Sequence, residues 1–207
     1  MARAFAEISF TPAVVDLQKT HGSVDGYAKF LDPAAARADR LGPAETAFIG
    51  TIDGCFQATI SDSGWPYVQF RGGPKGFLKV LDEQTIAYAD YRGNRQYLSV
   101  GNLKTNERIS LILLDYPNRR RLKVWGRARL VSMEDDPALI EQLMDTGYRA
   151  KPERAVVITI EALDWNCPAH IPQRMTLEEL EPMLGPLRDE LERLRVENEE
   201  LRGRVAG

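Results

Sequence analysis

Residues 48–73 read FIGTIDGCFQATISDSGWPYVQFRGG, and this stretch decides which class of fold the sequence predicts. Its apolar runs are short, rich in β-branched and aromatic residues, and interrupted by Gly, Asp, Ser and Pro, which is typical of strands joined by tight turns. The pair Asp53-Gly54 is a strong hairpin signal between the runs AFIGTID and FQATIS. Residues 61–64, SDSG, predict a second turn before the run PYVQF. The stretch therefore predicts three consecutive antiparallel strands.

Four further runs have the same character: TIAYAD, RISLILLD, RLKVWGRARLV and AVVITIEALDW. Seven short strands with mostly hairpin-like spacing predict an antiparallel barrel or sandwich. Two helices are expected between the strands, over residues 95–106 and 134–148. In the second, Asp135 or Asp136 would cap the helix and Pro137 would occupy its first position. The predicted fold class is mainly β with flanking helices.

The composition divides the chain into three parts. Residues 1–45 form a predicted helical extension, in which AKFLDPAAARADRL places Pro33 near a helix start. Residues 46–174 hold all the predicted strands. Residues 175–207 are leucine-rich and predict one further helix, separate in kind from the strands that precede it.

The leucines of this last part recur with a spacing of three and four residues, which is a heptad pattern. Positions d are Leu180, Leu187, Leu194 and Leu201, and positions a are Leu177, Leu184, Leu191, Asn198 and Val205. A single Asn at a with Leu at d favours a parallel two-stranded coiled coil. The flanking charges agree, since Glu190 and Glu197 fall at g while Arg195 and Arg202 fall at e. A single amphipathic helix lying on its own domain is the alternative.

Two prolines limit the length of this predicted coiled coil. Pro182 and Pro186 are expected to break its early part, which leaves about three heptads of uninterrupted helix. Such a short coil is marginal on its own. We therefore expect it to reinforce a dimer that forms elsewhere.

Composition excludes several classes of function. A net charge of −3 in 207 residues argues against a general nucleic-acid binder and against a polybasic membrane-surface protein. No apolar run approaches the roughly 20 residues that span a bilayer, and the N-terminus lacks the pattern of a signal peptide. Cys55 and Cys167 are isolated, as are both histidines, so free thiols, no metal site and a cytoplasmic location are expected.

Familiar catalytic motifs are absent, whereas anion-binding side chains gather around the middle strands. The sequence contains no GxSxG, HExxH, Walker or GxGxxG motif, and its paired acids lie in predicted turns or a helix cap. The concentration of cations and amides is highest in YADYRGNRQYL, residues 88–98. There Asn94 is expected to cap a helix whose first turn holds Arg95 and Gln96, an unfavourable place for a cation unless an anion is bound. Ordinary surface ion pairs with nearby acids are the alternative.

The order of these segments resembles the pyridoxamine 5'-phosphate oxidase family, the FMN-binding split β-barrels. The resemblance is carried by FIGTIDGCFQATISDSGWPYVQFRGG, FLKVLDEQTIAYADYRGNRQ and RLKVWGRARLV, and it covers about residues 44–165. It implies an antiparallel split barrel and a homodimer with two FMN molecules in the clefts between subunits. It also implies that Arg95 and Gln96 match the family's phosphate-holding Arg-Lys pair. Because Gln replaces Lys, Arg92 or Arg71 would supply the second charge.

The resemblance implies further contacts to the flavin. The residues implied to lie around it are Gln69, Phe70, Arg71, Lys79, Asp90 and Arg121, in addition to Asn94 of the phosphate corner. The segment GGPKG leaves the alignment ambiguous between Gln69–Arg71 and Phe77–Lys79. Trp165 and Arg174 are similar to a Trp and an Arg that close the oxidase site, although their spacing is one residue short.

The oxidase's substrate-binding Arg-x-His is not reproduced, so oxidation of pyridoxamine phosphate itself is not expected. The principal hypothesis is an FMN-dependent oxidoreductase acting on an unidentified small molecule, in which the flavin carries the chemistry. The alternative is a non-catalytic, regulatory module that binds flavin or haem and uses the coiled coil as a partner surface. His170, near Cys167, is a candidate axial ligand, so haem remains an alternative cofactor. The sequence does not distinguish a deazaflavin from FMN.

Overall fold

A computed structural model describes residues 2–145, 147–165 and 168–205. It divides into two compact units, one formed by residues 1–115 and 120–169 and the other by residues 116–119 and 170–207. The helices are α1 (Arg3–Ser9), α2 (Pro12–Thr20), α3 (Val24–Ala28), the 3-10 turn η1 (Lys29–Leu31), α4 (Pro43–Thr51), α5 (Leu98–Thr105), α6 (Pro137–Leu143) and α7 (Leu177–Val205). The strands are β1 (Gly54–Ile60), β2 (Pro66–Gly72), β3 (Lys79–Asp82), β4 (Thr85–Tyr91), β5 (Arg108–Asp115), β6 (Arg120–Ser132) and β7 (Pro152–Trp165).

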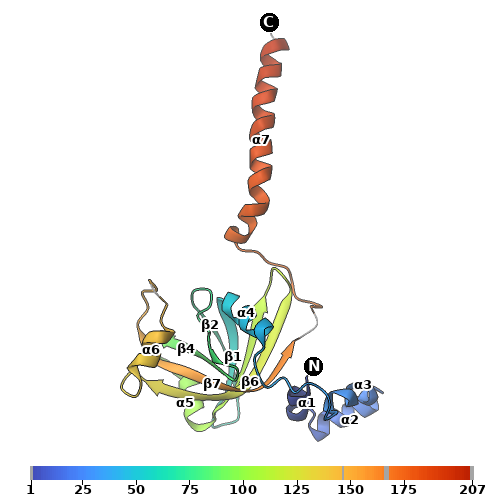
Figure 1. The fold of residues 1–207 in the computed structure, drawn as a ribbon, viewed down its shortest axis with the longest axis vertical. Helices are drawn as coiled ribbons and strands as arrows, with labels where there is room; N and C mark the ends of the chain where they lie inside the picture. The colour runs from blue at the N-terminus through green and yellow to red at the C-terminus, as the bar shows by residue number, and fades with distance from the viewer. Residues whose placement is uncertain (1, 146, 166–167, 206–207) are drawn as a thin grey trace. The chain divides into compact units, whose positions relative to one another are not determined.

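The seven strands form one antiparallel, strongly curled sheet in the order β2-β1-β5-β6-β7-β4-β3 (Figure 1). This order leaves β2 and β3 as the two edges, so the sheet is a split barrel rather than a closed one. The prediction of an antiparallel β-barrel with flanking helices is therefore confirmed. The predicted turn at residues 61–64 joins β1 to β2, and Asp136 caps α6 through its side chain, as expected.

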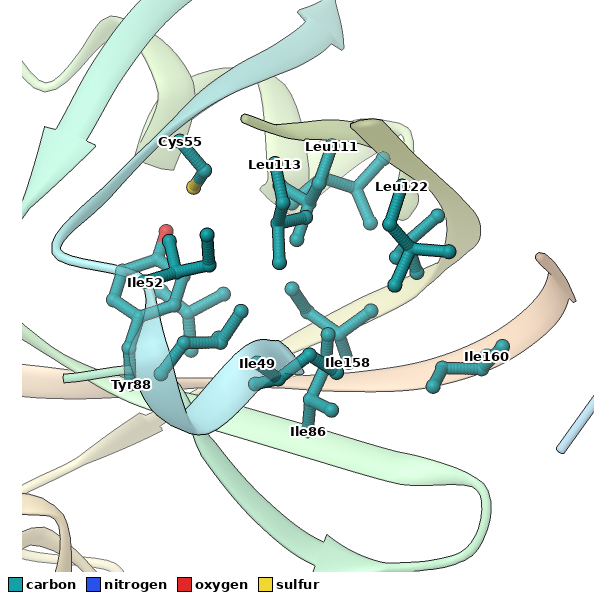
Figure 2. Packing of buried hydrophobic residues seen from close by; sticks show 14 of the residues in the cluster. Ile49, Ile52, Cys55, Ile86, Tyr88, Leu111, Leu113, Leu122, Ile158 and Ile160 are labelled. Carbon is teal, nitrogen blue, oxygen red and sulfur yellow. The ribbon is translucent and has the colours of Figure 1, made fainter. Parts of the chain in front are cut away.

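The inside of the curled sheet is filled by aliphatic side chains from almost every strand and from α4 (Figure 2). Ile49 of α4, Leu111 of β5 and Ile158 of β7 have no exposed surface. Strand β4 is buried on both faces, because α6 packs against its outer face with Ile140 and Leu143 while Ile86 faces inward. Burial of such side chains is the main favourable contribution to the stability of the barrel.

The first predicted strand is wrong, because residues 43–51 form the helix α4. Pro43 occupies its first position, and the Glu45 side chain accepts a hydrogen bond from the Gly42 N–H at 3.0 Å, which fixes the start of the helix. Phe48 and Ile49 then turn into the barrel core. Asp53-Gly54 consequently joins a helix to a strand and is not a hairpin. The seventh strand is instead β3, which the strand pattern did not predict.

Three other local predictions are also wrong. Residues 32–42 are not helical, and Asp32 accepts a hydrogen bond from the Ala34 N–H in a turn, so Pro33 does not begin a helix. Helix α5 begins at Leu98 rather than at residue 95. Helix α7 continues through Pro182 and Pro186.

Cys55 is a buried free thiol, as expected, whereas Cys167 lies outside the described residues, and with it any pairing between the two. Among the described helices, none has the length and apolar character to cross a membrane. The described part of the chain also holds no cluster of three or more His, Cys, Asp or Glu side chains that would suit a metal ion.

Candidate functional site

A polar groove lies where β2, β4 and the start of α5 come together. Its volume is about 290 Å³, and its walls are β2, the end of β4, the loop at residues 93–97, the first turn of α5 and Glu153 of β7. Six of the residues predicted to bind a cofactor line it, namely Gln69, Arg71, Asp90, Asn94, Arg95 and Gln96. The fold thus brings together three sequence segments that were predicted to act on one ligand.

The β2 wall of the groove is polar because alternate residues of the β1–β2 hairpin face inward. Gln69 and Arg71 lie opposite Gln57 and Cys55 of β1 in the antiparallel register. Helix α5 is attached to this polar face through Ser99 Oγ, which donates to Gln69 Oε1 at 3.0 Å. The hairpin therefore positions α5, and with it the amino end of the helix that closes the groove.

A buried carboxylate beside the groove forms ion pairs with two arginines. Asp90, only 5% exposed, lies 3.0 Å from Arg71 Nη1 and 3.4 Å from Arg154 Nη1. Burial raises the pKa of Asp90 above its usual range, and the two guanidiniums oppose that rise. The Nε of Arg71 is buried without a hydrogen-bond partner among the described residues. Arg71 consequently keeps an unused donor on a side chain already anchored by a carboxylate.

The loop at residues 93–97 is held in an uncommon backbone conformation. Arg95 and Tyr97 have φ angles of 63° and 54°, in the left-handed region that non-glycine residues seldom adopt. The predicted N-cap role of Asn94 is wrong: its Oδ1 accepts from the Gln96 N–H at 3.2 Å, two residues along, and Tyr97 occupies the cap position. Strain of this kind is concentrated at functional sites.

Among the described residues, the N-cap position of α5 provides no capping side chain. The N-cap residue Tyr97 makes no side-chain hydrogen bond to the first turn. The first N–H groups of a helix have no partner within it, and a left-handed residue followed by a helical one turns successive N–H groups toward one side as an anion-binding nest. The groove is lined at this point by Leu98, Ser99 and Val100. Its α5 wall is therefore a set of backbone donors with the positive end of the helix dipole behind it.

Glu153 and Arg154 of β7 hold this loop, and no sequence motif points to them. Tyr97 Oη donates to Glu153 Oε1 at 3.1 Å, and Arg95 Nε donates to Tyr97 Oη at 3.3 Å. Arg154 pairs with Glu153 at 2.9 Å and lies over the Tyr97 ring. The hydrogen bond to Tyr97 raises the pKa of Arg95. Only the register that places Arg154 opposite Asp90 could have identified these residues in advance.

Three of the predicted cofactor residues lie outside the groove. Phe70 lies on the opposite face of β2, where it is 61% exposed. Lys79 of β3 bonds through Nζ to Asp145 Oδ1 at 2.5 Å. Arg121 lies on β6 opposite Leu114 of β5.

The Trp and Arg compared with site-closing residues have other contacts. The Trp165 indole donates to Glu45 Oε1 of α4 at 2.7 Å and packs edge-on against Phe48. Arg174 lies over the ring of Tyr116, 5.1 Å from its centroid. Trp165 therefore closes the α4 end of the barrel core rather than the groove.

Comparison with protein-family models shows to which family the chain belongs. Residues 41–167 match the model described as pyridoxamine 5'-phosphate oxidase. The chain belongs to the pyridoxamine 5'-phosphate oxidase family. Comparison with curated proteins finds no match.

Solved structures of similar fold come from several bacteria. A candidate pyridoxamine 5'-phosphate oxidase from Lactobacillus delbrueckii is 23% identical, with a TM-score of 0.46, over 61% of this chain and 95% of that one. An FMN-binding protein from Syntrophomonas wolfei is 15% identical, with a TM-score of 0.47, over 59% and 83%. HupZ from Group A Streptococcus is 15% identical, with a TM-score of 0.47, over 60% and 98%. The assignment to the family rests on the family model rather than on these similarities.

Proposed function

We propose that this protein binds FMN in the groove beside α5 and is an FMN-dependent oxidoreductase for a small-molecule substrate. The observation that supports this most strongly is the convergence of Arg95, Gln96 and the uncapped amino end of α5 on one side of the groove. These are donors suited to a phosphate monoester.

The residues present fit the phosphate end of FMN. Arg95 is exposed, and within the described part of the chain its Nε bonds only a tyrosine hydroxyl, so its guanidinium remains able to donate to an anion. Gln96 supplies an amide where the family has a lysine, and the α5 N–H groups supply further donors. The carboxylates Asp90 and Glu153 also line the groove, but each is compensated by an arginine. The donor set is consequently not cancelled by neighbouring negative charge.

The ring end of the cofactor requires more surface than one chain provides. Pockets that enclose drug-sized ligands usually measure about 300–1,000 Å³, and this groove holds about 290 Å³ in one chain. The outer face of the β1–β2 hairpin is correspondingly apolar: Phe56, Val68 and Phe70 are 40%, 59% and 61% exposed. Apolar patches of this kind mark interaction sites. Because β2 is an edge strand, we propose a homodimer in which a second copy covers this face and reaches past the edge of β2 to complete the cofactor site on its other face.

Bound FMN would supply the redox chemistry, and the side chains of the protein would orient it and set the charge around it. Arg71 is suited to that role, because Asp90 fixes one end of its guanidinium while Nε remains without a partner among the described residues. A cation held beside the flavin would favour a negatively charged, reduced ring. Arg154 would keep Asp90 ionised and so keep Arg71 in place.

The proposal is tested by spectroscopy and by two ligands that differ only in the phosphate. Purified protein, or protein incubated with FMN and then freed of unbound FMN, should show flavin bands in the visible spectrum. A Soret band, or protein that ignores added FMN, would overturn the proposal. In Arg95→Ala, loss of a charge-assisted hydrogen bond of about 1.5–3 kcal/mol should weaken FMN binding by about 10- to 140-fold. Riboflavin binding should hardly change, because riboflavin has no phosphate.

A matched control separates this contact from general electrostatics. Arg129 is also exposed but lies on β6 outside the groove, so Arg129→Ala should leave both affinities unchanged. Equal losses of FMN and riboflavin affinity in Arg95→Ala would remove the phosphate assignment. Titration with a deazaflavin under the same conditions distinguishes the two ring systems.

A further inference from the structure

Helix α7 presents a long apolar stripe that has no buried residue. The helix has 29 residues, and along its stripe Leu187, Leu191, Leu194 and Leu201 are 65%, 50%, 47% and 50% exposed. A helix in water is stabilised mainly by packing of its apolar face rather than by intrinsic propensity. We therefore expect the apolar side chains of the stripe to pack against a second surface.

The helix-breaking residues of α7 lie away from this stripe. With Leu at position d, Pro182 falls at f, Gly185 at b and Pro186 at c, all on the outer face of a paired helix. A proline removes one backbone hydrogen bond and leaves a carbonyl without its partner. On the outer face water can satisfy that carbonyl. The prolines are thus compatible with a continuous apolar seam from Leu177 to Val205.

The continuous helix lengthens the available seam. Its 29 residues correspond to four heptads, and at about 1.5 Å per residue the helix extends about 43 Å. Three heptads would be marginal, whereas a fourth adds another a and d layer. The seam is therefore long enough to pair with a second helix of the same length.

The charges beside the seam specify its direction. In a parallel pair, position g of one helix lies near position e of the next heptad in its partner. Glu190 would meet the partner's Arg195, and Glu197 would meet the partner's Arg202. In an antiparallel pair g faces g and e faces e, so glutamates would oppose glutamates and arginines would oppose arginines. Opposite charges therefore favour only the parallel arrangement.

Asn198 also favours parallel pairing, and in addition favours pairing in register. It is the single polar residue among the a and d positions of α7, and a lone Asn at a prefers to face another Asn in a parallel dimer in register. Within one helix, Arg193 already pairs with Glu190 at 2.8 Å and with Glu197 at 3.0 Å. Because a carboxylate accepts several hydrogen bonds, these contacts orient the two glutamates without using up their acceptors.

We propose that α7 pairs with α7 of a second copy of this chain in a parallel, in-register two-stranded coiled coil. This inference concerns α7 alone and does not depend on the identity of the cofactor. The occupant of the stripe is the same stripe of another chain, as the seam, the Asn198 layer and the g–e charges all require.

Disulfide trapping in the full-length protein tests the proposal. With Cys167→Ser as background, Leu187→Cys and Leu201→Cys each place a thiol at a d position, where facing residues come close enough to bridge. Mild oxidation should convert most of each variant to a covalent dimer. When the two variants are mixed, links between equal positions should dominate. An excess of the 187–201 link would indicate antiparallel pairing and overturn the proposal.

Val196→Cys is the matched control. Val196 is 50% exposed, much like Leu194, but it lies at f on the outer face. Val196→Cys should remain without a covalent link under the same oxidation, although its helices still pair. If Val196→Cys cross-links as readily as the d variants, the links come from random collision or from a dimer formed elsewhere, and the proposal fails. If the d variants do not cross-link, the stripe is covered by something else, such as the chain's own barrel or a different protein.

Discussion

The barrel and α7 have similar aliphatic content, but the barrel buries its aliphatic side chains and α7 leaves them exposed. In the barrel, Leu122 of β6 and Ile158 of β7 are 0% exposed and pack against strands that are distant in sequence. In α7, Leu194 and Leu201 are 47% and 50% exposed. The barrel buries its apolar surface within one chain, and α7 does not. The difference implies that the barrel core forms within one chain, whereas the order of α7 should depend more strongly on protein concentration.

This contrast also separates two kinds of sequence information. The heptad pattern of α7 is local, because a, d, e and g are fixed by counting along one helix. The barrel is specified by pairings between distant strands, which local patterns indicate only in part. The effects of substitutions on stability should therefore differ between the two regions, both in size and in their dependence on protein concentration.

The largest effect is expected from a cavity in the barrel core. Ile158→Ala should lower the free energy of unfolding by about 2–5 kcal/mol, because a fully buried aliphatic side chain is truncated. Leu194→Ala should change it by less than about 0.5 kcal/mol when measured on the dilute protein. Urea denaturation of both variants checks this. A loss in Leu194→Ala comparable with that of Ile158→Ala would show that α7 packs on the barrel and that the contrast is false.

Most strands were predictable from sequence, but helix α4 was not. The runs that became β1, β2, β4, β5, β6 and β7 have β-branched residues bounded by turn residues. Residues 47–53 have the same composition, yet residues 47–51 are helical because they follow the helix start at Pro43 and Glu45. The strand β3 was missed as part of the pattern because it is only four residues long and pairs on one side with β4.

The site residues that lie together in one stretch of sequence were predictable. Those that reach the site through pairing of distant strands were not. Arg95 and Gln96 stand out because cations and amides surround a Gly-Asn step. Glu153 and Arg154 are ordinary charges at the start of β7, and they reach the groove only because β7 pairs with β4. The side chain of Phe70 could not be assigned to a face without the register of the β1–β2 hairpin. Long-range pairing is the information that the local pattern lacks.

A smaller effect is expected at high pH, where ionisation of Cys55 should lower the free energy of unfolding of the barrel by about 2 kcal/mol. Burial raises the pKa of the Cys55 thiol from its ordinary value of 9.0 to about 12. The folded pKa exceeds the unfolded one, so the stabilising contribution is complete below about pH 9 and is lost as pH rises toward 12. By about pH 10.5 the loss should reach about 2 kcal/mol.

Cys55→Ala isolates this contribution from other groups that titrate at high pH. The variant lacks the thiol, so its free energy of unfolding should fall less between about pH 8 and about pH 10.5 than that of the wild type. The two pH profiles should therefore approach each other by about 2 kcal/mol. Parallel profiles would mean that the folded thiol ionises as readily as the unfolded one.

Removal of residues 184–207 should weaken the dimer without destabilising the barrel. We expect the dissociation constant of the dimer to rise about tenfold, or ~1.4 kcal/mol, with urea denaturation of the barrel unchanged. Sedimentation of the truncated and full-length proteins over a range of concentrations measures this. A truncated protein that is entirely monomeric would show that α7 is the principal dimer contact and that the outer face of the β1–β2 hairpin is not.

The smallest effect is expected from the charges beside the α7 seam. Arg195→Glu with Arg202→Glu places like charges at both g–e contacts, and each lost pair should weaken the dimer by about 0.3–0.5 kcal/mol, less at high salt. Arg193→Ala is the control, because it removes two ion pairs within one helix, whereas the double variant removes one, Arg195 with Glu192, and it leaves the contacts between helices intact. If the control weakens the dimer as much, the charges act by stabilising each helix. If only the double variant does so, and only at low salt, they act across the seam and give α7 its parallel direction.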